Sequence, residues 1–286
     1  MHLTEAKRQA YIPGWRFLPT KRNRRMNAIE MKVKSSIRDI IDKRLKKMRE
    51  GEAKSEDLLG ILLESNMEEM KRKGKQEYGM SIDDVIEECK LFYVVGQETS
   101  SVLLVWTMIL LGRYQDWQTR AREEVLHAFG QDESLDLKKL NSLKLVKMIL
   151  YESLRLYPPV NSLKRRVVEE TTLGDIILPR GTMVSLPILL LHLDHDIWGE
   201  DVKEFKPERF NDGIMGATKG KNAFFPFGGG PRVCIGQSFS MEQAKIVMAT
   251  ILQRFSFELS PSYAHVPISI GTTRPRHGSP LIIKKL

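Results

Sequence analysis

A glycine-rich segment that runs directly into helical sequence constrains this chain more than any other feature. Residues 224–237 read FFPFGGGPRVCIGQ, and five of them follow the spacing Phe-x-x-Gly-x-Arg-x-Cys-x-Gly: Phe227, Gly230, Arg232, Cys234 and Gly236. Glycines let a backbone approach a large flat ligand, arginine supplies a guanidinium for a carboxylate, and helix N-terminal amides stabilise a thiolate. A buried structural cysteine would explain Cys234 but not its neighbours. The segment therefore predicts a loop that holds a thiolate.

The periodicity of apolar residues predicts a mainly α fold with a minor β-sheet. Helical spacing covers residues 23–50, 56–66, 82–129 with a break near 113–116, 137–157 and 235–254. Ser81 and Asp84 resemble a capping box at the start of the helix expected from residue 82, and Pro158-Pro159 ends the helix expected at 137–157. Short β-prone runs occupy 165–168, 175–178, 182–186, 267–270 and 280–284. With 286 residues, 42% of them hydrophobic, the chain can bury a substantial core.

The net charge of +9 comes from the N-terminal part of the chain. Residues 1–50 contain fifteen Lys/Arg against five Asp/Glu, whereas the other residues contain thirty against thirty-one. Such a tract can bind nucleic acid or an anionic membrane, but the periodic apolar residues within it favour the solvated face of an amphipathic helix. No signal peptide is visible, and the apolar stretch Val102 to Leu111 is too short to span a bilayer. The two cysteines, Cys89 and Cys234, are too few for a disulfide framework, and neither belongs to a CxxC or Cys/His cluster of the kind that holds zinc.

Polar residues interrupt the long apolar helix expected at 82–129. Gly96 and the run from Gln97 to Ser101 lie between apolar segments, and buried polar groups are costly without partners. Thr99 can hydrogen-bond the carbonyl of Val95, which opens a groove for water or a ligand, and Glu98 beside it offers a proton. A helix with one polar stripe explains the same residues equally well.

A possible buried charge network involves two distant segments. Glu152 and Arg155 lie one helical turn apart in ILYESLRLYPP, and as a surface pair they would contribute only about 0.2–0.5 kcal/mol. Apolar neighbours indicate that the pair is buried and needs a further partner. Arg209, in the segment FKPERFNDG, can supply the third charge and fasten that loop to the helix.

These four patterns occur in the order found in the cytochromes P450, and the whole chain resembles the C-terminal portion of a plant microsomal enzyme of clan 72, the group that includes secologanin synthase. The resemblance implies a cytochrome P450 fold that is N-terminally incomplete, with the membrane anchor and first helices absent from residues 1–286. One departure is Val95, which stands where the family has a small residue.

The resemblance also implies roles for individual residues. Cys234 would be the axial ligand of haem iron, with Phe227, Gly230 and Gly236 around it. Arg232 and Arg166 would bind the haem propionates, and Glu98 with Thr99 would deliver protons to bound dioxygen. Glu152, Arg155 and Arg209 would form a structural triad. Substrate would contact Val160, Asn161, Ser162, Leu163, Gly271, Thr272 and Thr273, whereas Cys89 matches no functional position.

The implied function is that of a haem-thiolate monooxygenase. It would use haem b and O2 to insert one oxygen atom into an apolar substrate, expected to be a terpenoid, with electrons from NADPH–cytochrome P450 reductase. The expected location is the cytosolic face of the endoplasmic reticulum membrane, with no nucleic-acid partner. Two alternatives remain open: a catalytically inactive fragment that keeps the core of the fold, and a P450-like isomerase or dehydratase, which would need no proton delivery to O2.

Overall fold

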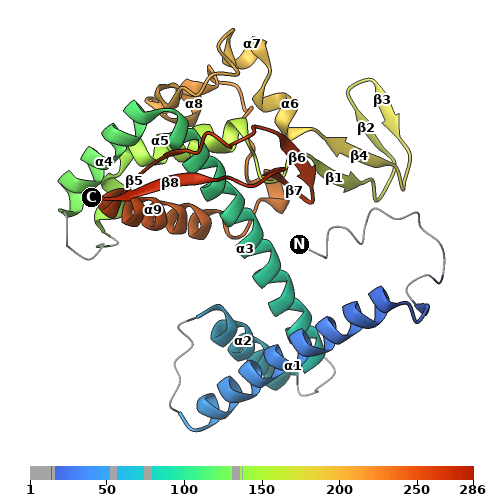
Figure 1. Cartoon of the computed structure of the whole chain (residues 1–286). Helices are drawn as coiled ribbons and strands as arrows, with labels where there is room; N and C mark the ends of the chain where they lie inside the picture. Colours follow the sequence, from blue (N-terminus) through green and yellow to red (C-terminus); the bar gives the residue numbers. More distant parts are fainter. Residues whose placement is uncertain (1–13, 15–16, 52–56, 74–78, 131–135, 137) are drawn as a thin grey trace. The chain divides into compact units, whose positions relative to one another are not determined.

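The computed structural model describes residues 14, 17–51, 57–73, 79–130, 136 and 138–286. The chain divides into two compact units, Met1–Val95 and Gly96–Leu286. Figure 1 shows the first unit as helices and the second as helices with several short strands. One helix, α3 (Ile82–Arg113), contributes residues to both units. The mainly α fold expected from the periodicity is confirmed.

The first unit contains α1 (Lys21–Arg49), α2 (Leu58–Lys73) and the first turns of α3. Its small core consists of Ile41, Leu63, Val85 and Ile86, one or two residues from each helix. Lys21, Arg24 and Arg25 are exposed, as expected for the solvated face of an amphipathic helix.

The start of α3 confirms the predicted capping box. The amide of Ser81 donates to Asp84 Oδ2 over 2.9 Å, and the amide of Asp84 donates to Ser81 Oγ over 3.2 Å. These two bonds satisfy amides that have no partner within the helix. The beginning of the helix that carries the polar segment is therefore set by its own sequence.

The second unit is built around longer helices joined by short ones. The longer helices after α3 are α4 (Gln115–Phe129), α5 (Lys144–Leu156) and α9 (Gln237–Arg254). The short helices are α6 (Ile188–His192), α7 (His195–Trp198), α8 (Gly213–Ala217) and the 3-10 turns η4 (Lys139–Ser142), η5 (Pro207–Phe210) and η6 (Gly230–Arg232). As expected, α5 ends just before Pro158-Pro159.

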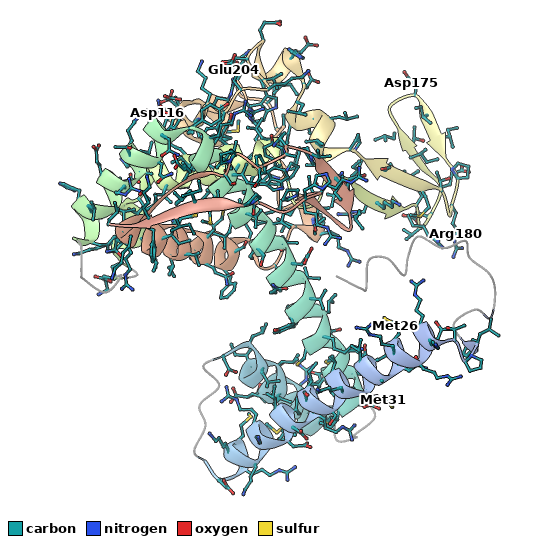
Figure 2. The ribbon with its side chains drawn as sticks, in the orientation of Figure 1. Met26, Met31, Asp116, Asp175, Arg180 and Glu204 are labelled. Atoms are coloured by element: carbon teal, nitrogen blue, oxygen red, sulfur yellow. The ribbon has the colours of Figure 1, made fainter. Side chains whose placement is uncertain are left out.

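Among the described residues, the strands form four two-stranded antiparallel sheets, so the β structure is minor, as expected. They are β1 (Leu163–Arg166) with β4 (Met183–Leu186), β2 (Thr171–Leu173) with β3 (Ile176–Leu178), β5 (Phe255–Leu259) with β8 (Leu281–Lys285), and β6 (Pro267–Ile270) with β7 (Thr272–Pro275). In β1–β4 the partners run from Leu163 with Leu186 to Arg166 with Met183. Figure 2 labels Asp175 at the turn between β2 and β3.

The core of the second unit buries one face of α3. Leu103, Leu110 and Leu111 of this helix belong to one cluster with residues of α4, α5 and α9, such as Val125 and Leu150. Among the described residues, α3 is the helix whose length and apolar composition would suffice to cross a membrane.

Candidate functional site

The segment around Cys234 forms a loop closed by backbone hydrogen bonds. The amide of Cys234 donates to the carbonyl of Phe227 over 2.9 Å, and the amide of Gly228 donates to the carbonyl of Phe225 over 3.0 Å. Gly228 and Gly230 have φ of +73° and +68°, a region that residues with a Cβ rarely adopt. An ideal Cβ on Gly228 would also lie 3.5 Å from Leu163 Cδ1. The backbone conformation therefore favours glycine at position 228, and the 3.5 Å distance places Leu163 in ordinary van der Waals contact with the loop.

The thiol of Cys234 is free, and it is exposed next to the first turn of α9. An ideal Cβ on Gly236, the residue before α9, would lie 3.9 Å from Sγ, so the sulfur sits beside the start of that helix. Three apolar neighbours are exposed as well: Val233 by 47%, Ile235 by 89% and Phe239 by 72%. An exposed apolar surface around a thiol fits contact with a large apolar group.

The other cysteine has a different environment. Cys89 belongs to the first unit and is half-buried, and burial followed by the charge of Glu88 raises the pKa of its thiol. A raised pKa keeps this side chain a neutral thiol at neutral pH. Cys89 therefore lacks the properties of a thiolate ligand.

The polar segment of α3 lies beside α9. Ser100 Oγ and Ser240 Oγ are 3.2 Å apart, which joins the turn after Thr99 to the first turn of α9. An ideal Cβ on Gly96 would meet nothing within 4 Å, so the helix faces open space at this point. Because Cys234 immediately precedes α9, the contact places the Glu98–Thr99 region and the thiol loop along one side of the second unit.

Glu98 is held by β7. Thr272 Oγ1 donates to Glu98 Oε1 over 2.8 Å, and Arg274 Nη1 lies 4.0 Å from the same oxygen. The amide of Thr273 donates to the carbonyl of Pro159 over 3.0 Å, which attaches β7 to the segment 160–163. The two segments expected to line a substrate pocket are therefore adjacent, and one of them contacts the acid.

Glu152 and Arg155 form a fully buried, bidentate ion pair. Arg155 Nε and Nη2 donate to Glu152 Oε2 and Oε1, each over 2.7 Å, and neither side chain is exposed. Arg155 also donates to the carbonyls of His192, Val202 and Glu204; Figure 2 labels Glu204. These hydrogen bonds give the buried guanidinium the partners that a buried charge requires. The pair fastens α5 to the chain between α6 and η5.

Arg209 reaches the same carboxylate from η5. Its Nε lies 3.4 Å from Glu152 Oε1 without hydrogen-bond geometry, so the contact is one of charge. Its Nη2 lies 2.7 Å from Asp201 Oδ1, and its Nη1 donates to the carbonyl of Trp198. Hydrogen bonds from Lys206 and then Arg209 lower the pKa of Asp201 to about 2. The structure thus brings Glu152, Arg155 and Arg209 together.

His192 connects this network to the thiol loop, and the sequence patterns did not single it out. Its ring is fully buried, its Nε2 accepts a 3.0 Å hydrogen bond from the amide of Phe225, and its centroid lies 5.2 Å from that of Phe224. Burial, followed by the charge of Arg155, lowers the pKa of His192 to about 4. A neutral imidazole can accept this bond, so His192 supports the start of the loop that carries Cys234.

Arg165 of β1 is a basic residue that the sequence patterns did not single out. Side chains alternate between the two faces of a strand, so Leu163 and Arg165 share one face of β1 while Arg166 lies on the other. Leu163 is the residue that packs against Gly228 of the thiol loop. The face toward the loop therefore carries Arg165, and the two-residue period of the strand was the signal that could have indicated it.

Comparison with known proteins defines the family. The cytochrome P450 family model matches residues 3–280. Among curated proteins, the chain is 59% identical over 276 residues to cytochrome P450 72A397 of Kalopanax septemlobus, covering 96% of this chain and 53% of the relative. It is 54% identical over 288 residues to secologanin synthase 1 of Catharanthus roseus, covering all of this chain and 55% of the relative. A crystal structure of a cytochrome P450, CYP102L1, superimposes with a TM-score of 0.85 at 26% identity, over 98% of this chain and 62% of that one.

The chain belongs to the cytochrome P450 family, and the resemblance to the plant group that includes secologanin synthase is confirmed. It spans about half the length of the curated relatives it matches. The cytochrome P450 fold expected from the sequence is likewise confirmed.

The residues around Cys234 fit the haem that the family implies. A thiol sulfur is the donor type that ligates P450 haem iron, and the exposed Val233, Ile235 and Phe239 offer apolar contact. Arg232 has no hydrogen bond or ion pair within the part of the chain that the structure describes, so its charge is available to a carboxylate. Open space beside Gly96 leaves room on the α3 side.

Proposed function

We propose that this chain is the haem-binding C-terminal portion of a monooxygenase that inserts one oxygen atom from O2 into an apolar substrate. The observation that carries the proposal is the free, exposed thiol of Cys234 in a closed glycine loop at the start of α9. Bound haem b would supply the binding and activation of O2. The electrons would come from an NADPH-dependent reductase.

In this proposal each site residue has a defined task. Cys234 ligates the iron, and the bond from its amide to Phe227 fixes the loop on which the sulfur is carried. Arg232 binds a propionate, with Arg165 or Arg166 of β1 as a second cation. Phe227, Gly230 and Gly236 shape the loop so that the macrocycle can approach. Glu152, Arg155 and Arg209 hold the surrounding segments together rather than take part in chemistry.

Proton delivery is assigned to Glu98 and Thr99. Glu98 Oε1 is engaged by Thr272 Oγ1, which leaves its second carboxylate oxygen as the atom that exchanges protons with water and with Thr99. Because Thr272 also belongs to the expected substrate-lining segment, a substrate that contacts β7 would influence the position of the acid. Thr99 then either positions the water whose proton is transferred or supplies the proton from its own hydroxyl.

The substrate class and the location are part of the same proposal. The segment 160–163 and Gly271, Thr272 and Thr273 line the pocket, and Val160 and Leu163 favour an apolar molecule. A terpenoid is proposed on the basis of the similarity to relatives called secologanin synthase. The similarity to these plant relatives also supports a microsomal enzyme at the endoplasmic reticulum membrane, with the reductase as its partner.

The experiment is to complete the chain with the N-terminal half of a close relative and to assay oxygenation with a reductase. Incorporation of an atom from labelled O2 into an apolar product is expected. Thr99→Ala should still oxidise NADPH but form less product per NADPH consumed, because water is no longer positioned for proton transfer. Product that stays matched to NADPH consumption in Thr99→Ala would contradict the role of Thr99. Absence of labelled product from the completed parent, with haem bound, would contradict the function itself.

A further inference from the structure

Three aromatic and imidazole side chains form a continuous column in the second unit. Trp106 of α3 and Tyr157, at the end of α5, are stacked with ring centroids 4.0 Å apart and an interplanar angle of 9°. Tyr157 Oη lies 3.0 Å from His265 Nε2, and Tyr263 Oη lies 2.8 Å from His265 Nδ1. We call Trp106, Tyr157 and His265 the aromatic column. No step of the proposed oxygenation uses it.

The column runs from the interior to the surface. Trp106 is fully buried, and its Nε1 donates to the carbonyl of Thr273 over 2.7 Å. His265 is exposed. Trp106 also lies seven residues after Thr99 on the same helix, which at 1.5 Å per residue is about 10 Å along its axis. The inner end of the column is therefore near the expected reaction site, and its outer end meets water.

The chemistry of these groups suits one-electron oxidation. Indole and phenol are among the side chains most readily oxidised, and a parallel stack at 4.0 Å brings their π-systems into contact. A phenol that loses an electron becomes a strong acid and must lose its proton at the same time. His265 Nε2 is placed to accept that proton over a single hydrogen bond.

The protonation states of the resting column support this direction of transfer. Burial raises the pKa of Tyr157 to about 12, so the phenol keeps its proton until it is oxidised. Burial, followed by the charge of Arg113, lowers the pKa of His265, so its imidazole is a neutral base at neutral pH. The other ionisable groups around the same pocket are Arg113, Tyr114, Lys203 and Tyr263, and none of them is a carboxylate.

We propose that the aromatic column is a relay that removes oxidising equivalents from the interior. An electron passes from Tyr157 to an oxidised Trp106, the Tyr157 O–H bond breaks, and its proton moves to His265 Nε2. The products are a neutral indole, a neutral tyrosyl radical and an imidazolium that returns its proton to water. The oxidant is any one-electron oxidant of higher potential than the indole. The proposal rests on the proposed function only for the natural source of this oxidant, which would be activated oxygen that does not reach a substrate.

The test supplies the oxidant from outside, so that its result does not depend on haem or on oxygenation. The haem-free chain is mixed with a photoexcitable ruthenium tris-bipyridine complex and a sacrificial electron acceptor, and radicals are followed by transient absorption and electron paramagnetic resonance after a flash. The parent should give a tryptophanyl signal that converts to a tyrosyl signal, with a slower conversion in D2O because a proton moves.

Three variants assign the signal to the column. Tyr157→Phe keeps the stacked ring but removes the phenol, so the tyrosyl yield should fall and the tryptophanyl signal should last longer. Tyr114→Phe is the matched control, since Tyr114 lines the same pocket but its ring packs against Phe205 instead of an indole; it should behave as the parent. His265→Phe keeps a ring without a nitrogen and should slow the conversion.

Circular dichroism melts confirm that each variant is folded. Equal tyrosyl yields in Tyr157→Phe and Tyr114→Phe would overturn the proposal, because the radical would then reside elsewhere. An unchanged rate of conversion in His265→Phe would equally overturn the assignment of the proton to His265. A positive result combined with failed oxygenation would leave the relay in place and reject only the proposed function.

Discussion

Acidification should destabilise the second unit through one buried histidine. His192 is fully buried and accepts a hydrogen bond from the amide of Phe225, so protonation both places a charge in the core and removes the acceptor. The charge of Arg155, whose Nη1 donates to the carbonyl of His192, opposes protonation as well. The pKa of His192 is about 4 in the folded chain.

The direction and the size of this pH effect on stability follow from the difference between the pKa of His192 in the folded and in the unfolded chain. A free histidine titrates near 6.5, so the unfolded chain takes up the proton first as the pH falls. The stabilising effect is complete above about pH 6.5 and is lost as the pH falls from there to about 4. At about 1.4 kcal/mol per pKa unit, the loss amounts to about 3 kcal/mol. Asp201, with a pKa of about 2 that lies below its ordinary value, contributes stability that is lost only at still lower pH.

The assay is urea unfolding at several pH values from neutral to acidic, with the parent compared to His192→Gln. Glutamine offers an oxygen that can accept the amide hydrogen bond and does not titrate, so the pH-dependent difference between the two isolates His192. His195→Gln is the control, because His195 lies three residues away and half of its side chain is exposed. The free energy of unfolding of the parent should fall by about 3 kcal/mol more than that of His192→Gln. Parallel pH profiles for these two proteins would refute the reasoning.

Two further predictions concern the ion pair and the strand arginines. Glu152→Gln leaves the buried guanidinium of Arg155 without its counter-charge and should cost about 3–5 kcal/mol in urea unfolding, whereas Glu123→Gln on the exposed face of α4 should change little; similar costs for both would contradict the network. In the completed protein, Arg165→Gln should weaken haem binding in an apoprotein titration more than Arg166→Gln, and the reverse order would show that the strand faces are assigned wrongly.

Local signals in the sequence predicted the longer helices and the loop, although α2 continues to Lys73, beyond the end expected at residue 66. Ser81 and Asp84 cap α3 as expected because both partners of the capping box lie within one turn. The positive φ of Gly228 and Gly230 likewise matches a loop that the glycine run predicted. The strand β5 was missed because the helical spacing of α9 continues up to it without a Gly or Pro, and its partner β8 lies at the other end of the C-terminal segment.

Contacts between distant residues could not be read from the sequence. The bond between Glu98 and Thr272 joins residues 174 positions apart. The bond between His192 and Phe225 joins the end of α6 to the segment before the thiol loop, and these two segments carry no shared sequence pattern. Such features depend on packing of the whole unit, and only the structure reveals them.

The most direct test of the central claim is the carbon monoxide difference spectrum of the reduced, N-terminally completed protein. Its Soret band should be that of a haem with a thiolate ligand. Cys234→Ser should abolish the thiolate character, because serine offers no sulfur donor at the start of α9, while Cys89→Ser should leave the band unchanged. A thiolate-type band that persists in Cys234→Ser would contradict the assignment of Cys234 as the iron ligand and with it the proposed function.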